Sequence, residues 1–186
     1  MQPNKVRGVV FDLWRTIVDP GGPRYVARIA AVLNERGCVA VSADDVARAL
    51  DQRGHLRHAR PIDELNDDLW RAFTGAAARA ADLSALRDQH RQFVHRARMI
   101  PGASQLLDEL QHRGVEVAVV SNATVASDAV VERLVIGERV PHVALSCHTG
   151  YAKPDPRAFR VVTGRWGLEP ADVCVVGDKW ETDIAG

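Results

Sequence analysis

The sequence predicts an α/β protein: a sheet of parallel strands with helices on its faces, interrupted after its first strand by a purely helical segment. Two observations support this fold. Four short segments are rich in β-branched, apolar residues, as strands buried on both faces are. Amphipathic segments with helical spacing separate the last three of them, and this alternation favours parallel pairing with right-handed crossovers.

The strands are expected at residues 6–14, 115–122, 143–147 and 172–178. The helices that connect them are expected at residues 104–114 and 154–167. The first of these helices places three leucines on one face and ends in glycine, and the second begins with prolines, which favour the first turn of a helix.

The inserted segment, residues 20–98, is dominated by Ala, Arg, Leu and Asp and contains no convincing strand pattern from residue 24 onward. Four helices are expected in it, at residues 23–37, 42–54, 63–80 and 84–97. The second begins with Ser42, a typical N-cap residue, and has acidic residues in its first turn. The predicted organisation is a core of residues 1–19 and 99–186, with hinges near residues 19–23 and 98–103 on either side of the insertion.

Composition argues against several classes of function. The 24 basic and 24 acidic residues give a formal net charge of zero, so we expect neither a nucleic-acid partner nor an anionic membrane surface. The apolar runs are too short to span a bilayer, and we expect no signal peptide. The three cysteines, Cys38, Cys147 and Cys174, lack metal-ligand spacing and are expected to be reduced, mostly buried thiols of a cytoplasmic protein.

Polar side chains stand at the ends of all four predicted strands. Ligands of open α/β sheets bind at the carboxyl ends of the strands, so Asp12, Ser121 with Asn122, Lys153 and Asp178 with Lys179 are expected to converge there. The two acids suit a divalent cation, for which Mg²⁺ is the candidate. Ser121, the Asn122 backbone and Lys153 suit an anionic group, and Asp12 is placed to attack it and form an acyl-type covalent intermediate.

Four segments in this order and spacing carry a resemblance to a known family: FDLWRT (11–16), VVSN (119–122), SCHTGYAKPDPRAF (146–159) and VVGDKWETDIAG (175–186). They resemble the haloacid dehalogenase (HAD) superfamily of hydrolases, in its C1-type subgroup with a helical cap inserted after the first motif. The resemblance covers nearly the whole chain. It implies a Rossmann-like core with an inserted α-helical cap.

Related folds continue with at least one further strand after the fourth motif, so the core is expected to lack its C-terminal strand. The strand at residues 172–178 would then be an apolar edge open to strand pairing. A second subunit covering that edge, in a homodimer, is one expectation.

The resemblance also implies roles for individual residues. Asp12 would be the nucleophile, Ser121 the anion-binding hydroxyl and Lys153 the lysine that stabilises developing charge. Asp178 would be a metal ligand, and Asp183 a supporting acid that helps to organise the fourth motif. The cofactor implied is Mg²⁺.

Trp14 departs from the pattern of the family's phosphatases, which have a second aspartate two residues after the nucleophile. That aspartate protonates the leaving oxygen and then activates water, whereas an indole N–H only donates and does not titrate. Losing general acid–base catalysis costs a factor of about 10² to 10⁴. The main-chain carbonyl at this position is a metal ligand in the family, and Trp14 can supply it. Arg15 is a second departure, because these loops usually have glycine there.

One interpretation is a Mg²⁺-dependent phosphohydrolase acting on a small phosphorylated metabolite. The missing acid would come from His55 or His58 in the segment 53–61 of the cap, or a good leaving group would make it unnecessary. The arginines of that segment, Arg57 among them, could hold phosphate. The predicted substrate-binding residues are Asn122, Thr16, Tyr25, Arg57 and His58.

A second interpretation is a 2-haloacid dehalogenase, because these enzymes have an aromatic residue at the position of Trp14 and halide leaves without a proton. Dehalogenases work without metal, however, and have serine where this chain has Asp178. Three acids, Asp12, Asp178 and Asp183, would repel one another unless a cation lies among them, which favours phosphate chemistry. A third interpretation is a catalytically weak or inactive protein that serves in interactions.

Overall fold

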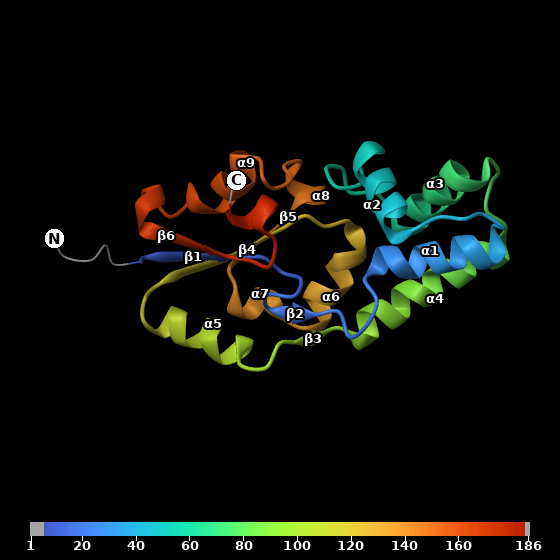
Figure 1. Ribbon diagram of the computed structural model, residues 1–186. Helices are drawn as coiled ribbons and strands as arrows, with labels where there is room; N and C mark the ends of the chain where they lie inside the picture. Colours follow the sequence, from blue (N-terminus) through green and yellow to red (C-terminus); the bar gives the residue numbers. More distant parts are fainter. Residues whose placement is uncertain (1–5, 185–186) are drawn as a thin grey trace.

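The computed structural model describes residues 6–184, and it confirms the predicted α/β fold. Within these residues, four parallel strands pair in the order β5-β4-β1-β6 (Figure 1). They are β1 (Gly8–Phe11), β4 (Glu116–Ser121), β5 (His142–Leu145) and β6 (Val173–Val176). Each overlaps a segment that the sequence predicts as a strand. β1 ends earlier than predicted because the chain turns back at once, with the Ile17 and Val18 amides donating to the Leu13 carbonyl.

Helices cover both faces of this sheet (Figure 1). They are α5 (Ala103–His112), α6 (Asp128–Arg133), α7 (Ile136–Arg139), α8 (Ser146–Thr149) and α9 (Pro156–Thr163). Successive strand residues point to opposite faces, so Val10 and Val120 pack toward α9 while Phe11 and Val119 enter the larger core with α5, α6 and α7. Burial on both faces explains the continuous apolar runs of the strands.

The predicted insertion is helical. Its helices are α1 (Tyr25–Arg36), α2 (Ala43–Gln52), α3 (Ile62–Thr74) and α4 (Ala80–Arg96). Two short strands that the sequence analysis missed, β2 (Val18–Asp19) and β3 (Arg98–Met99), pair antiparallel at the two predicted hinges. This pairing ties the two ends of the insertion together where it leaves the core.

Caps account for the helix boundaries in the insertion. Ser42 is the N-cap of α2, as predicted, and forms a capping box with Asp45. The prediction that the third helix runs to residue 80 is wrong. Gly75 ends α3 in the left-handed conformation, with a φ of 73°, which glycine adopts at little cost.

Among the described strands, β6 lies at the edge of the sheet, with the Cys174 and Val176 side chains exposed. The expectation of mostly buried thiols is therefore wrong for two of the three free cysteines: Cys38 and Cys174 are exposed, and Cys147 is buried. Cys174 is exposed because it lies on the face of β6 opposite to Val173 and Val175, which pack with the cluster around α9. The expectation of a missing C-terminal strand concerns the chain beyond residue 184, which lies outside the described residues.

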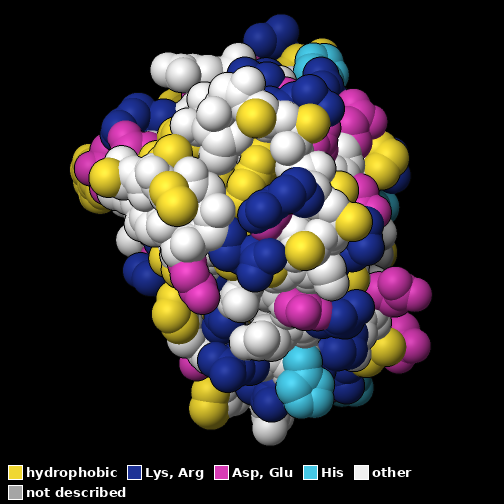
Figure 2. All heavy atoms as spheres, turned by 90° about the vertical axis from the view of Figure 1, so that its right-hand side faces the viewer, with side chains coloured by type: hydrophobic (Ala, Val, Ile, Leu, Met, Phe, Trp, Pro, Cys, Tyr) yellow, Lys and Arg dark blue, Asp and Glu magenta, His cyan; other side chains and the backbone are white. Residues whose placement is uncertain are grey.

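The end of the molecule formed by the insertion carries basic and acidic side chains interspersed with hydrophobic ones (Figure 2). Many of them pair, as Arg71 does with Asp67 and Arg87 with Asp63, each at 2.7 Å. Between residues 6 and 184, no helix has both the length and the apolar composition needed to cross a membrane.

Candidate active site

The carboxyl ends of β1, β4 and β6 open into a cavity of about 280 Å³, which the insertion lines on the opposite side. The core contributes the predicted residues Asp12, Ser121, Asn122, Lys153, Asp178 and Asp183. The insertion contributes Tyr25, Val26, Ala47, Leu50, Leu56 and Phe93. The sheet edge is therefore polar, and the facing wall is largely apolar.

Lys153 bridges two of the predicted acids. Its Nζ donates to Asp12 Oδ1 and to Asp183 Oδ1, each at 2.6 Å. All three side chains are buried, so these charge-assisted hydrogen bonds are little screened by water. The Asp12 amide donates to the Val176 carbonyl at 2.8 Å, which continues the β1–β6 ladder and fixes the backbone of Asp12.

Asn122 holds the backbone of Lys153. Its Nδ2 donates to the Lys153 carbonyl at 2.7 Å, and its Oδ1 accepts from the Lys153 amide at 2.6 Å. Both polar atoms of the amide group are thereby engaged. The side chain of Asn122 therefore positions Lys153, and the predicted role of the Asn122 backbone in binding an anionic group stays a prediction.

Asp183 is held by the turn that contains the fourth motif. Residues Trp180–Ile184 form a π-helical turn, and the Lys179 amide donates to Asp183 Oδ2 at 3.0 Å. Gly177 makes this possible, because a Cβ at that position would lie 2.3 Å from Asp183 Oδ2. The glycine before Asp178 was not singled out from the sequence, where nothing shows that a carboxylate lies against it.

The carboxylates suit a divalent cation. Oxygen atoms of Asp12, Asp178 and Asp183 lie within 4.8 Å of one another. Burial raises the pKa of Asp12, with Lys153 acting in the opposite direction. Burial also acts to raise the pKa of Asp183, but hydrogen bonds from Lys153 and the Lys179 amide outweigh it and lower that pKa. Lys153 alone thus does not offset the burial of Asp12, and a cation beside it would.

Comparison with known proteins identifies the family. Residues 6–186 match the family described as haloacid dehalogenase-like hydrolase. This chain belongs to that family. The resemblance of the four motifs to this superfamily is therefore confirmed, and the C1-type cap subgroup stays a prediction.

Individual relatives include both phosphatases and a dehalogenase. A ribulose-1,5-bisphosphate 5-phosphatase of Halopiger xanaduensis is 34% identical over 110 residues, which are 58% of this chain and 46% of that protein. The (S)-2-haloacid dehalogenase 4A of Burkholderia cepacia is 25% identical over 98% of this chain and 80% of its own length. The match to the phosphatase thus spans less than half the length of that relative.

Solved structures show the same fold. A putative HAD-hydrolase, YfnB, from Bacillus subtilis, whose crystal structure is described as bound to magnesium, superposes with a TM-score of 0.60. The two chains are 19% identical, and the match covers 97% of this chain and 82% of the other.

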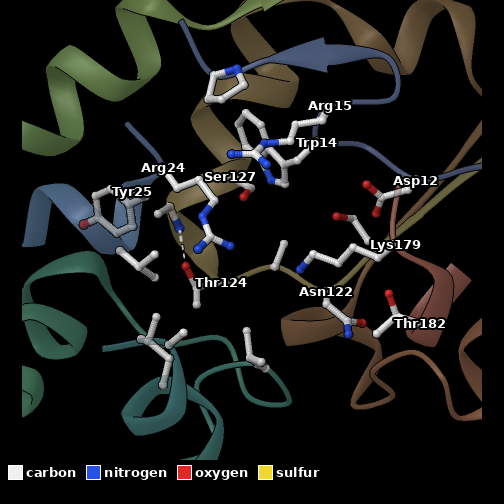
Figure 3. Close-up of a pocket in the computed structure, with 18 of the residues that line it drawn as sticks. Asp12, Trp14, Arg15, Arg24, Tyr25, Asn122, Thr124, Ser127, Lys179 and Thr182 are labelled. Atoms are coloured by element: carbon white, nitrogen blue, oxygen red, sulfur yellow. Dashed lines mark hydrogen bonds between the residues drawn. The ribbon is translucent and has the colours of Figure 1, made fainter. Parts of the chain in front are cut away.

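In this family member, Trp14 packs against the insertion. Its ring lies 5.0 Å from the Phe93 ring of α4, and Phe93 in turn lies 5.2 Å from Tyr25 (Figure 3 shows Trp14 and Tyr25). Arg15 follows with a φ of 62°, in the left-handed region where glycine is favoured. Arg15 therefore holds a backbone conformation that the glycine usual at this position would adopt at less cost. The Trp14 main-chain carbonyl stays a predicted metal ligand.

Neither of the predicted proton shuttles lies at the cavity. His55 is buried, with Nε2 2.8 Å from Asp68 Oδ2, and His58 is exposed; neither lines the cavity. Arg57 is exposed and pairs with Asp51. These placements correct the expectation that Arg57 and His58 face a substrate, because both residues are exposed to solvent outside the cavity lining. Only Leu56 of this segment lines the cavity.

Of the two other predicted substrate contacts, Tyr25 lies at the cavity and Thr16 does not. Tyr25 lines the cavity, but its hydroxyl donates to Asn66 Oδ1 at 3.3 Å, inside the insertion. Burial raises the pKa of Tyr25, so the phenol stays protonated. Thr16 does not line the cavity, and its buried hydroxyl has no hydrogen-bond partner among the described residues.

Lys179, which was expected at the strand ends, lines the cavity, whereas Arg24, Thr124 and Ser127 were missed. Arg24, just before α1, and Lys179, just after Asp178, extend into the same space from opposite sides (Figure 3). Thr124 and Ser127 line it from the loop after β4. For Lys179, its position beside Asp178 at a strand end was the signal that predicted it. For Arg24 there was none, because only the fold brings the start of the insertion over the strand ends.

Proposed function

We propose that this chain is a Mg²⁺-dependent phosphohydrolase that uses Asp12 as nucleophile on a small phosphorylated substrate. The main support is the arrangement of Lys153 between Asp12 and Asp183, with Asp178 in the same cluster. The phosphatase relative from Halopiger xanaduensis and a phosphoserine phosphatase from Thermus thermophilus, 32% identical over 115 residues, support the substrate class.

Each core residue has a part in this chemistry. Asp12 attacks phosphorus, the bond from phosphorus to the leaving oxygen breaks, and an acyl phosphate forms on Asp12. Ser121 and Lys153 stabilise the oxygens on which negative charge develops. Asp183 keeps Lys153 in place. When bound by Asp12, Asp178 and the Trp14 carbonyl, Mg²⁺ would neutralise the carboxylates and the transferring group; the magnesium-bound Bacillus subtilis relative supports this choice of metal.

Few side chains in the cavity could act as a general acid. Of the described residues that line it, none is a histidine, and the Tyr25 hydroxyl is engaged with Asn66. Trp14 stands at the sequence position, two residues after Asp12, where the family's phosphatases have their acid. We therefore expect the substrate to have a good leaving group, such as the carboxylate of an acyl phosphate.

The second half-reaction lacks a base for the same reason. Water must attack the acyl phosphate of Asp12 with no side chain at position 14 to accept its proton. Breakdown of this covalent intermediate is then expected to limit turnover. A burst of leaving group, followed by slow steady-state release of phosphate, would be its kinetic signature.

The insertion is proposed to act as a cap over Asp12. Its Leu50, Leu56 and Phe93 give the cavity an apolar wall that limits water around the reacting group. Arg24, whose guanidinium lies 3.7 Å from the exposed Asp44 carboxylate, extends into the cavity and suits a second anionic group on the substrate.

Dehalogenation is the second candidate. The aromatic Trp14, the apolar wall and the Burkholderia cepacia relative favour it. Asp12 would attack the carbon that carries the halogen, and halide would leave without needing a proton. The acidic cluster of Asp12, Asp178 and Asp183 favours the phosphatase.

The test is release of phosphate from acetyl phosphate and from glucose 6-phosphate, with and without Mg²⁺, alongside halide release from 2-chloropropionate. Asp12→Asn is the inactive variant, and Asp108→Asn, on α5 and outside the cavity lining, is its matched control. Mg²⁺-dependent release from acetyl phosphate that only Asp12→Asn abolishes is expected. Phosphate release equal in both variants would refute the proposal, and metal-independent halide release would establish the second candidate.

A further inference from the structure

A second cluster of metal-ligating side chains lies away from the catalytic cavity. Ligand atoms of Asp128, Cys147 and His148 all lie within 4.8 Å of one another. None of the three lines the catalytic cavity. We propose that they form a separate binding site for a thiophilic divalent cation, Zn²⁺ by its donor chemistry.

The sheet brings these ligands together from two distant segments. β4 and β5 are parallel neighbours, so the segments after them leave the same edge side by side. Asp128 begins α6 after β4, and Cys147 and His148 lie in α8 directly after β5. The Cys147 amide donates to the Ala123 carbonyl at 3.3 Å, and the Ser146 hydroxyl donates to the same carbonyl at 3.2 Å. The ligands therefore stand on backbone that is held in place before any cation binds.

The donor set is one thiol, one imidazole and one carboxylate. Zn²⁺ is bound by these three groups in proteins, whereas Mg²⁺ prefers oxygen ligands alone. His148 Nε2 lies 2.9 Å from Asp128 Oδ1, so the nitrogen and the oxygen already face each other. Three protein ligands leave one tetrahedral position, for water or for Glu132, which lines a surface hollow together with Asp128 and His148.

Burial controls how this site would be loaded. The Cys147 residue is 2% exposed, but the His148 and Asp128 side chains are 48% and 43% exposed. A cation can thus enter from solvent through the two outer ligands and reach the sulfur beneath them.

A cation here would act on the loop between β4 and α6. Ala123, Thr124, Ala126 and Ser127 of this loop line the catalytic cavity, and Asp128 comes directly after them. Binding would tie the end of this loop to α8 and stabilise the folded chain by mass action. It would do so without contributing a ligand to the catalytic carboxylates.

Titration of the reduced full chain with Co²⁺, followed by absorption spectroscopy, tests the proposal. A thiolate-to-cobalt charge-transfer band that saturates at one Co²⁺ per chain and is displaced by Zn²⁺ is the expected result. Cys147→Ser should abolish the band. The double variant Cys38→Ser/Cys174→Ser, which removes the two exposed thiols, and Asp178→Asn, which removes a catalytic carboxylate, should both keep it.

The variant His148→Ala provides an independent test, because this half-exposed side chain can be removed without leaving a cavity in the core. It should weaken Co²⁺ binding by at least about tenfold, the lower end of what is lost even with a group that only orients a metal ligand. Zn²⁺ should also raise the melting temperature of the wild-type chain more than that of His148→Ala. A wild-type chain without the band, a band that survives Cys147→Ser, or unchanged affinity in His148→Ala would each overturn the proposal. If Cys147→Ser does not fold, His148→Ala decides.

Discussion

Replacing Trp14 by aspartate would test whether this one side chain sets the substrate preference of the proposed phosphatase. Trp14→Asp puts a titratable carboxylate on the cavity wall, two residues after Asp12. It should leave kcat/KM for acetyl phosphate nearly unchanged, because kcat/KM reports the first half-reaction, in which that leaving group departs without a proton. For glucose 6-phosphate, whose sugar alkoxide leaves poorly, kcat/KM should rise by a factor of about 10² or more.

The contacts of Trp14 indicate how much this substitution should lower the free energy of unfolding. Trp14 is half-buried and pairs with Phe93 at 5.0 Å, a contact worth about 0.5 to 1.5 kcal/mol beyond its buried area. Full truncation of a buried tryptophan costs about 3 to 5 kcal/mol, so about 1 to 3 kcal/mol is expected at this half-buried site. A domain with the usual stability of about 5 to 15 kcal/mol remains folded after that loss.

The assay compares kcat/KM for the two substrates in wild type, Trp14→Asp and Trp14→Asn. The asparagine variant removes the same ring without adding an acid, and circular dichroism and urea unfolding report whether each variant is folded. A gain on glucose 6-phosphate confined to Trp14→Asp supports general acid catalysis. Equal rates in the two variants would refute the idea that the missing acid limits the enzyme.

Three further predictions concern the backbone and charge of the fold. Gly177→Ala should reduce kcat by more than about tenfold, because its Cβ would lie 2.3 Å from Asp183 Oδ2 and displace that carboxylate from the lysine it holds. Arg15→Gly should raise the free energy of unfolding in urea by about 0.5 to 1 kcal/mol, since a φ of 62° strains any side chain but glycine. Asp68→Asn should lower the stability at pH 7 more than at pH 3. Hydrogen bonding to Arg53 holds the Asp68 pKa at about 2, below its unfolded value near 4, so the stabilisation present above about pH 4 is lost as the pH falls toward 2.

Each of these three predictions has a control or a result that would contradict it. Gly137→Ala is the match for Gly177→Ala, because a Cβ at Gly137 meets no atom within 4 Å; equal losses in both would contradict the steric explanation. Arg15→Ala keeps the strained backbone, so it should not stabilise the fold, and equal gains in the alanine and glycine variants would point to charge instead. A pH-independent difference between Asp68→Asn and wild type, by urea unfolding, would count against the ion pair with Arg53.

Local sequence patterns predicted much of the fold. Apolar, β-branched runs identified all four strands of the parallel sheet, because a strand that is buried on both faces is apolar at successive positions. Helix signals worked where caps were strong, as at Ser42, and failed near residue 75, where a glycine ends α3 inside a continuous amphipathic pattern. The two-residue strands β2 and β3 carry no periodic signal, and their pairing joins segments about eighty residues apart in the chain.

The residues alone indicate the family and the succession of strands along the chain. They also indicate which acids, lysine and serine stand at the strand ends. These are properties of short segments, and each motif includes the polar side chains expected to take part in the reaction. The partners of those side chains depend instead on how the chain folds. Asn122 is bound to the Lys153 backbone, Lys153 to both Asp12 and Asp183, and His55 to Asp68 inside the insertion. A buried polar group takes whichever partner the packing brings within hydrogen-bond distance, and those partners lie far away in the sequence.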